Sequence, residues 1–228
     1  MNERKKILLN LIIKEYIKSA SPVGSKSLAD AGRLEVSSAT IRNDMAELEN
    51  EGYIAQPHTS AGRVPTAKGY KFYLESIQQG KLSAAEEKSL KNILARLKLG
   101  NHELLIKILA KAMVEMSKNT VVVGFSENNV YYTGIANLFC QPEFQSPSRI
   151  YDISLIIDHL DGVMAKLFHQ LNQGVEVKIG VDNPFDRQCS AILTSWGKKK
   201  KGIIGLLGPM RMDYEKNLGL INFFKQNI

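Results

Sequence analysis

Disulfide bridges and membrane spans are the first features that this sequence lacks. Its 228 residues include two cysteines, Cys140 and Cys189, which lie far apart and indicate free thiols of a reducing compartment. No apolar run approaches the roughly eighteen residues that a transmembrane helix needs. Lys14, Glu15 and Lys18 interrupt the first apolar stretch, unlike the core of a signal peptide. We therefore expect a cytoplasmic protein that does not associate with membranes.

Catalytic and metal-binding patterns are missing as well. The four histidines do not have the spacing of a zinc site, and neither cysteine has a histidine partner close by in the sequence. The glycines of segment 202–208 lack the lysine and hydroxyl residue of a phosphate-binding P-loop, so a strand ending in a tight turn is the better interpretation. We expect no catalytic residue, no metal site and no cofactor, and hence a protein that is not an enzyme.

Basic residues exceed acidic ones across the chain. There are 30 lysines and arginines against 23 acids, a net charge of +7, and the isoelectric point is about 9.3. Such a balance favours an anionic partner, with nucleic acid as the first possibility. The excess is not concentrated, because residues 1–75 hold 11 basic and 9 acidic residues. The positions of individual residues must therefore identify any DNA-binding face.

The first 80 residues have the element order of a winged helix-turn-helix domain. Apolar residues recur at helical spacing, serines stand where helix caps are needed, and glycines stand where helices end. Ser25 is predicted to cap the second helix, and Ser37 or Ser38 the third. Prolines in the two extended segments suit the edge strands of a small hairpin. The predicted helices span 3–19, 25–29, 38–51 and 67–79, with extended segments at 53–57 and 63–66.

The third helix of this domain carries residue types that read DNA bases. With Ile41, Met45 and Leu48 buried, Asn43 faces outward and Arg42 lies on its flank. An arginine can pair with guanine and an asparagine with adenine in the major groove, and hydroxyls near a helix N-terminus suit a phosphate. Glu47, Glu49 and Glu51 all lie in the far half of the predicted helix, as expected for a helix that enters a groove N-terminus first. A solvated amphipathic helix is the alternative interpretation.

The predicted hairpin resembles a wing. Its tip is small and polar, with His58 and Thr59 as hydrogen-bonding residues and Arg63 as the cation for a phosphate or the minor groove. Lys68 and Lys71 follow within one helical turn and suit phosphate contacts, although an ordinary solvated surface is the alternative. The candidate DNA contacts are Ser25, Lys26, Ser37, Ser38, Thr40, Arg42, Asn43, His58, Thr59, Arg63, Lys68 and Lys71.

The rest of the chain predicts a mixed α+β domain. Segment 80–83 marks the seam, and two helices at 84–99 and 102–118 follow it. The domain plan is therefore 1–80 for DNA binding, 81–120 as a helical linker or dimerisation segment, and 121–228 as the α+β domain. Lys198–Lys201 are expected at a hairpin tip or, alternatively, on DNA or an acidic partner. Beyond residue 120 we expect strands at 121–125, 130–132, 175–179, 191–196 and 203–207, and helices at 150–157, 163–171 and 214–224.

Long ordered motifs in both halves resemble one bacterial family. The sequence is similar to HrcA, the heat-inducible transcription repressors, and the matching segments are spread along the whole chain. They lie at 22–25, 37–45, 56–66, 68–70, 72–73, 132–138, 141–144, 179–180, 189–190 and 205–214.

The resemblance implies a fold and a function. It implies a winged helix-turn-helix domain followed by a reduced GAF-like α+β domain. It also implies a repressor of heat-shock and chaperone genes that binds double-stranded DNA as a homodimer, at an inverted-repeat operator like the CIRCE element. A GroEL-type chaperonin would modulate it. A winged-helix regulator that responds to a small molecule is the alternative function.

The chain departs from the usual family pattern in two ways. Family members are longer in the middle, where further residues complete the GAF-like domain and carry an inserted dimerisation domain. Here the helices of 84–118 run almost directly into the strand at 121–125. In addition, Met210 stands where the family usually has threonine, so the turn before Tyr214 loses a hydroxyl.

Overall fold

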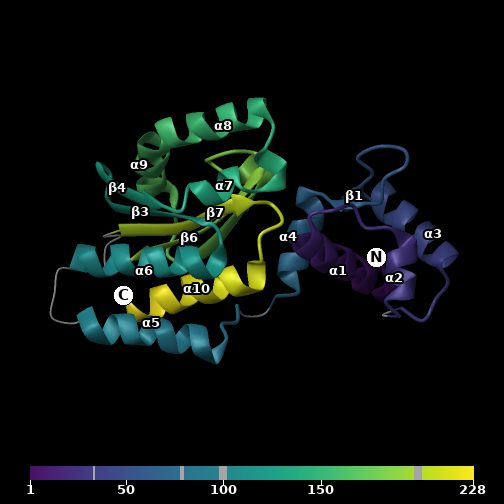
Figure 1. Cartoon of the computed structure of the whole chain (residues 1–228), viewed down its shortest axis with the longest axis horizontal. Coiled ribbons are helices and arrows are strands. Elements are labelled where there is room, and N and C mark those ends of the chain that lie inside the picture. The colour runs from purple at the N-terminus through teal and green to yellow at the C-terminus, as the bar shows by residue number, and fades with distance from the viewer. Residues whose placement is uncertain (33, 78–79, 98–101, 198–201) are drawn as a thin grey trace. The chain divides into compact units, whose positions relative to one another are not determined.

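The computed structural model describes residues 1–228 apart from 33, 78–79, 98–101 and 198–201 (Figure 1). The chain divides into two compact units, Met1–Gln78 (unit 1) and Gln79–Ile228 (unit 2), and each is described by itself. The predicted Lys198–Lys201 tip lies outside the described residues. Within the described part of the chain, every helix is too short or too polar to cross a membrane.

Unit 1 is a helix-turn-helix with a small wing. The leucines and isoleucines of the first helix, with Leu8 and Ile12 fully buried, form its core and pack against the third helix, the fourth helix and the wing. The wing is an antiparallel pair in which Ile54 lies opposite Pro65. The elements are α1 (Glu3–Ser19), α2 (Ser25–Asp30), α3 (Ser38–Asn50), β1 (Ile54–Ala55), β2 (Val64–Pro65) and α4 (Ala67–Glu75).

Local side-chain bonds set most of these boundaries. Ser37 caps α3 by accepting a hydrogen bond from the amide of Thr40, as the sequence predicts. The predicted capping role of Ser25 is wrong, because Gly24 is the N-cap of α2 and Ser25 is its first helical residue. The fourth helix is also shorter than predicted and ends at Glu75.

Unit 2 is built on a five-stranded antiparallel sheet in the order β4-β3-β7-β6-β5. All five strands were predicted, with ends within two residues of those observed. Every residue of β6 and β7 is buried, because helices cover both faces of the sheet. The strands are β3 (Thr120–Ser126), β4 (Asn129–Thr133), β5 (Val175–Ile179), β6 (Cys189–Trp196) and β7 (Gly202–Pro209).

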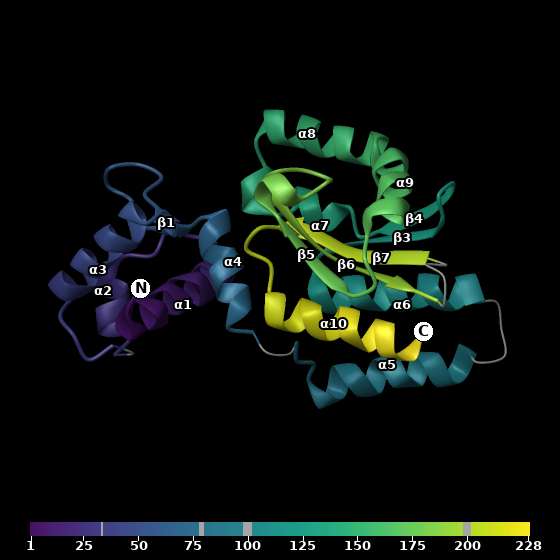
Figure 2. The same cartoon turned by 180° about the vertical axis from the view of Figure 1, so that it is seen from behind.

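Two helical layers enclose this sheet, as Figures 1 and 2 show from opposite sides. Helices α6 and α10 contact one face, and α5 packs on α6. Helices α7 and α9 contact the strands of the other face, and α8 packs on both of them. The helices are α5 (Ala84–Leu97), α6 (His102–Ser117), α7 (Ala136–Phe139), α8 (Pro147–Asp158), α9 (Leu160–Gln170) and α10 (Tyr214–Asn227), with 3-10 turns η1 (Pro142–Phe144) and η2 (Gly180–Asp182).

The helices expected as a separate linker belong to unit 2 instead. Helix α6 buries Ile106, Leu109 and Met113 against β3 and α10, so most of its apolar face is core. Leu104 is an exception and is half exposed. Three short elements, α7, η1 and η2, were not predicted, because three- and four-residue turns carry no periodic signal.

Candidate nucleic-acid interface

The outer face of α3 is open to solvent, as its spacing predicts. Ile41 and Leu48 are fully buried, and Met45 nearly so, while Arg42 and Asn43 are exposed. In the part of the chain that the structure describes, neither side chain has a hydrogen-bond or ionic partner. A guanidinium and an amide that are both unpaired and adjacent can bond to the edges of successive bases.

The hydroxyls at the start of α3 are arranged differently from one another. Ser37 Oγ accepts from the Thr40 amide at 3.1 Å and lies 3.0 Å from Thr40 Oγ1, so both residues serve the helix cap. Ser38 is exposed at the first helical position. On α2, Lys26 is exposed and Ser25 is half-buried. The first turn of α3 therefore offers one uncommitted hydroxyl rather than three.

Two acidic residues of α3, Asp44 and Glu47, pair with cations of α1. The Arg4 guanidinium donates to both carboxylate oxygens of Asp44, with Nε–Oδ2 at 2.7 Å and Nη2–Oδ1 at 2.9 Å. The Asp44 side chain is only 6% exposed, so this bidentate pair fixes α3 against α1. Lys5 pairs with Glu47 and Glu51, and the hydrogen bond that its ammonium donates to the Glu47 carboxylate raises the pKa of Lys5.

Sequence reasoning missed this network. It placed the acids away from DNA but assigned them no partners. The available signal was weak: two cations adjoin in the first turn of α1, and Asp44, Glu47 and Glu51 recur at intervals of three and four residues, which gives one helix face. The partners are forty or more positions apart in the sequence, so the path of the chain had to be known first.

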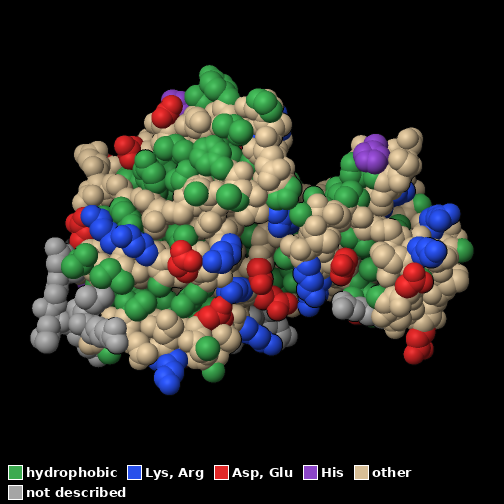
Figure 3. Space-filling view, viewed as in Figure 1, with side chains coloured by type: hydrophobic (Ala, Val, Ile, Leu, Met, Phe, Trp, Pro, Cys, Tyr) green, Lys and Arg blue, Asp and Glu red, His purple; other side chains and the backbone are tan. Residues whose placement is uncertain are grey.

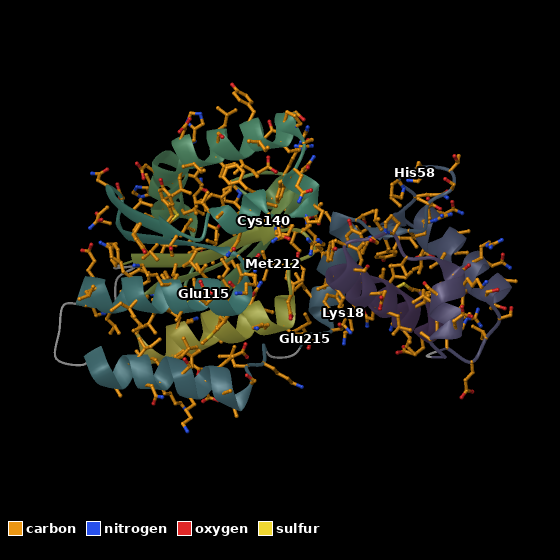
Figure 4. All side chains as sticks on the ribbon, in the orientation of Figure 1. Lys18, His58, Glu115, Cys140, Met212 and Glu215 are labelled. Atoms are coloured by element: carbon orange, nitrogen blue, oxygen red, sulfur yellow. The ribbon has the colours of Figure 1, made fainter. Side chains whose placement is uncertain are left out.

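The wing is held in shape by a glutamine. Gln56 Nε2 donates to the carbonyls of Thr59 at 2.9 Å and Ala61 at 3.0 Å, which closes the loop between β1 and β2. His58 and Thr59 are exposed in this loop, and the His58 side chain projects from it, as Figure 4 shows. At the loop's end, Gly62 lies so close to the Val23 backbone that a Cβ would be 2.5 Å from its carbonyl carbon. Only glycine fits there.

The prediction that Arg63 is the cation of the wing tip is wrong. Arg63 exchanges two backbone hydrogen bonds with Val23, at 2.8 and 2.9 Å, so it lies at the base of the wing. Its Nε donates to Glu49 Oε2 at 2.8 Å, and its side chain is 19% exposed. Glu49 also accepts from the Gln56 amide at 2.9 Å. Arg63 therefore joins the wing to α3 and is a positioning residue.

Lys68 is exposed and makes contacts within unit 1, while its role as a phosphate contact stays a prediction. Its Nζ donates to the carbonyl of Glu51, the C-cap of α3, at 2.7 Å and lies 4.4 Å from the centre of the Tyr53 ring. A cation at a helix C-terminus is stabilising because the carbonyls there carry partial negative charge. Lys71, three residues further along α4, is exposed.

In unit 2, polar contacts join the segments that resemble the family motifs. Arg211 pairs with Glu143, and its Nη2 donates to Gln141 Oε1 at 2.6 Å. The Tyr214 hydroxyl is 2.7 Å from Ser190 Oγ and donates to the Met210 carbonyl at 2.6 Å. Because that last contact uses the backbone of Met210, the turn is held without the threonine hydroxyl.

The two cysteines of unit 2 differ in exposure, since Cys140 is exposed and Cys189 is buried. Both cysteines are free, and burial raises the pKa of the Cys189 thiol, which disfavours the nucleophilic thiolate. In the part of the chain that is described, no group of three histidine, cysteine or acidic residues could hold a metal ion.

Comparisons with known proteins agree with the two units. The profile of the HrcA C-terminal domain matches residues 71–218, and that of the DeoR-like helix-turn-helix domain matches residues 12–66. The heat-inducible transcription repressor HrcA of Brevibacillus brevis is 27% identical, over 100% of this chain and 97% of that protein. The protein of the same name from Desulforudis audaxviator is 26% identical over the same shares.

The alignment with the Brevibacillus protein runs over 332 positions, against 228 residues here, so that relative contains positions without a counterpart in this chain. A crystal structure of a hypothetical protein has the same fold, with a TM-score of 0.81, 19% identity and full coverage of both chains. Since the C-terminal profile alone matches well over half of the chain, this protein belongs to the HrcA family, whose named members are heat-inducible transcription repressors.

Proposed function

We propose that this protein represses transcription by binding an inverted-repeat DNA operator, like the CIRCE element, upstream of heat-shock and chaperone genes. Two copies bind, each placing α3 in a major groove and its wing on the flanking backbone or minor groove. Occupation of the promoter then blocks transcription sterically. In this proposal the protein is a regulator rather than an enzyme, and it acts in the cytoplasm.

The observation that carries the proposal is that the acids of α3 are paired with cations, whereas its first half has unpaired polar side chains. Arg42 and Asn43 in its first half have no partner in the described residues, whereas Asp44, Glu47 and Glu49 are each paired with a cation. Pairing reduces the repulsion that these acids would exert on phosphates. The helix can therefore approach DNA with two base-reading side chains uncommitted.

The candidate residues divide into those that contact DNA and those that hold α3 and the wing in place. We assign Arg42 and Asn43 to bases. Arg63 and Lys68 hold the wing and the end of α3 in place. Exposed residues of α2, α3, α4 and the wing supply contacts to phosphates and sugars, namely Lys26, Ser38, Lys71, His58 and Thr59.

Fluorescence anisotropy across a salt series tests the proposal. The probes are a palindromic chaperone-promoter operator and a scrambled duplex of the same length. We expect a preference of about a thousandfold for the palindrome and a steep loss of affinity with salt. Equal, weak binding to both duplexes would overturn sequence-specific repression.

Relief of repression by heat is a second part of the proposal. Heat lowers the fraction of active repressor, either because unit 2 loses its fold or because a GroEL-type chaperonin is drawn away to other clients. The family resemblance supports this step. Operator affinity is to be measured after mild heating, with and without chaperonin; identical affinities in the two samples would count against the chaperonin.

A further inference from the structure

Helix α8 presents apolar side chains to solvent. Tyr151 is 64% exposed, Ile150 44% and Leu155 37%, although Ile153 and Ile156 on the opposite side are buried in the core of unit 2. Figure 3 shows hydrophobic side chains gathered over α8 and over the region between α8 and β4. Exposed apolar patches of this kind mark surfaces that bind another protein.

The exposed side of α8 has a pattern that suits a second helix. Pro147, Tyr151, Ser154 and Asp158 recur at intervals of four, three and four residues, so they form one line along the helix. Ser154 is small, and its hydroxyl is satisfied by the Ile150 carbonyl at 3.0 Å. A small residue beside a large aromatic lets two such lines interdigitate.

The charges at the two ends of α8 point to the identity of the partner. Ser146 makes no side-chain cap bond, and the first turn contains no acid. The last turn contains no base and ends in the exposed Asp158. The N-terminus therefore lacks a stabilising carboxylate, and Asp158 puts an unfavourable charge at the C-terminus, because carboxylates favour the N-terminus and cations the C-terminus. A second α8 running antiparallel would correct both ends at once.

We propose that α8 is the surface through which two copies of this chain pair. The twofold axis crosses the pair of helices at the level of their midpoints, between residues 152 and 153, as a symmetric interface requires. Tyr151 then lies level with Ser154 of the second copy, and Asp158 lies over the first turn of the second copy's helix. Ile150 and Leu155 flank this contact on opposite sides.

This inference rests on the proposed dimeric repressor and names its pairing surface. A helix of 12 residues is about 18 Å long, so the contact alone is smaller than a stable interface requires. The dimer is therefore weak in solution and is strengthened on DNA, because two half-sites hold both copies at high local concentration.

Sedimentation velocity over a range of protein concentrations tests the surface. Leu155→Glu places a carboxylate in the apolar contact of each copy and should weaken dimerisation at least about tenfold. Leu104→Glu is the matched control, since Leu104 is a 51% exposed leucine on α6, which covers the other face of the sheet. Circular dichroism checks that both variants fold.

A charge change at Asp158 separates an effect on the interface from an effect on folding. Asp158→Lys puts a cation at the C-terminus of its own helix, which stabilises that helix, and over the first turn of the second copy, which is repulsive. We expect unchanged or higher thermal stability together with a weaker dimer. Weaker dimerisation accompanied by lower thermal stability would contradict the proposed geometry.

The outcomes for the pairing surface and for the repressor function are distinguishable. If the parent and the Leu155→Glu variant dimerise equally well, α8 is not the pairing surface, while operator binding can still hold. If Leu155→Glu weakens pairing but neither protein prefers the palindrome, the surface stands and the repressor function fails. A parent chain that stays monomeric, both free and on the palindromic duplex, overturns the pairing surface.

Discussion

In unit 1, ion pairs reach helix α3 from two elements: Arg4 and Lys5 approach from α1, and Arg63 approaches from the wing. Unit 2 is organised differently, since β6 and β7 are buried along their whole length and contain no charged residue. The orientation of α3 should therefore respond to salt and substitution of charges, whereas the sheet of unit 2 should respond to lost apolar volume.

The largest expected effect is on the sheet. Leu193→Ala removes a fully buried side chain from β6 and should lower the free energy of unfolding of unit 2 by about 2–5 kcal/mol. Trp196 is the chain's one tryptophan and lies in β6, so its fluorescence during urea unfolding follows unit 2. Val181→Ala, at an 85% exposed position, is the control and should have little effect.

A smaller effect is expected at the DNA face. Arg42→Ala should weaken operator binding by about 1–3 kcal/mol and relax sequence preference, because a base contact is lost. Its thermal stability should match that of the parent, since Arg42 is exposed and has no partner among the described residues. Anisotropy on operators with single base changes measures both. Parent-like affinity would show that α3 does not read the operator through this residue.

Substitutions of Lys68 and Lys71 distinguish a residue that positions α3 from a residue that contacts DNA. Lys68→Ala should cost about 0.5–1 kcal/mol of unit 1 stability through the lost bond to the end of α3, and it should leave the salt slope of DNA binding unchanged. Lys71→Ala should reduce that slope by about one unit if Lys71 contacts a phosphate. A reduced slope for Lys68→Ala would restore Lys68 to the DNA contacts.

The smallest effect concerns an ion pair of unit 2. The Lys216 ammonium, 2.7 Å away, and the Ser83 amide lower the pKa of Glu86 from its usual 4.5 to about 2. The folded state thus favours the ionised carboxylate of Glu86. The stabilisation that this ion pair contributes is complete above pH 4.5 and is lost as the pH falls toward 2. Glu86→Gln should reduce the acid sensitivity of Trp196 fluorescence. Equal acid sensitivity in both proteins would exclude a contribution from this pair.

Sequence patterns predicted all but the shortest elements of the two units, because periodicity and capping are local properties. The spacing of Ile41, Met45 and Leu48 was enough to place Arg42 and Asn43 on the open face of α3. The contacts of Arg63 and Lys68 within unit 1 were not predicted, because a cation next to a candidate wing has the same sequence signature whether it bonds DNA or a neighbouring helix. The acceptors, Glu49 and the Glu51 carbonyl, become neighbours only when the hairpin folds back on α3.

The bond between Arg4 and Asp44 makes the orientation of α3 depend on the first turn of α1. Asp44 directly follows Asn43 and is nearly buried, so the angle at which α3 presents its outer face depends on a guanidinium four residues into the chain. Proteolytic trimming past Arg4 would leave that carboxylate without its guanidinium partner and let α3 tilt. Protein trimmed past Arg4 and intact protein should then differ in operator affinity.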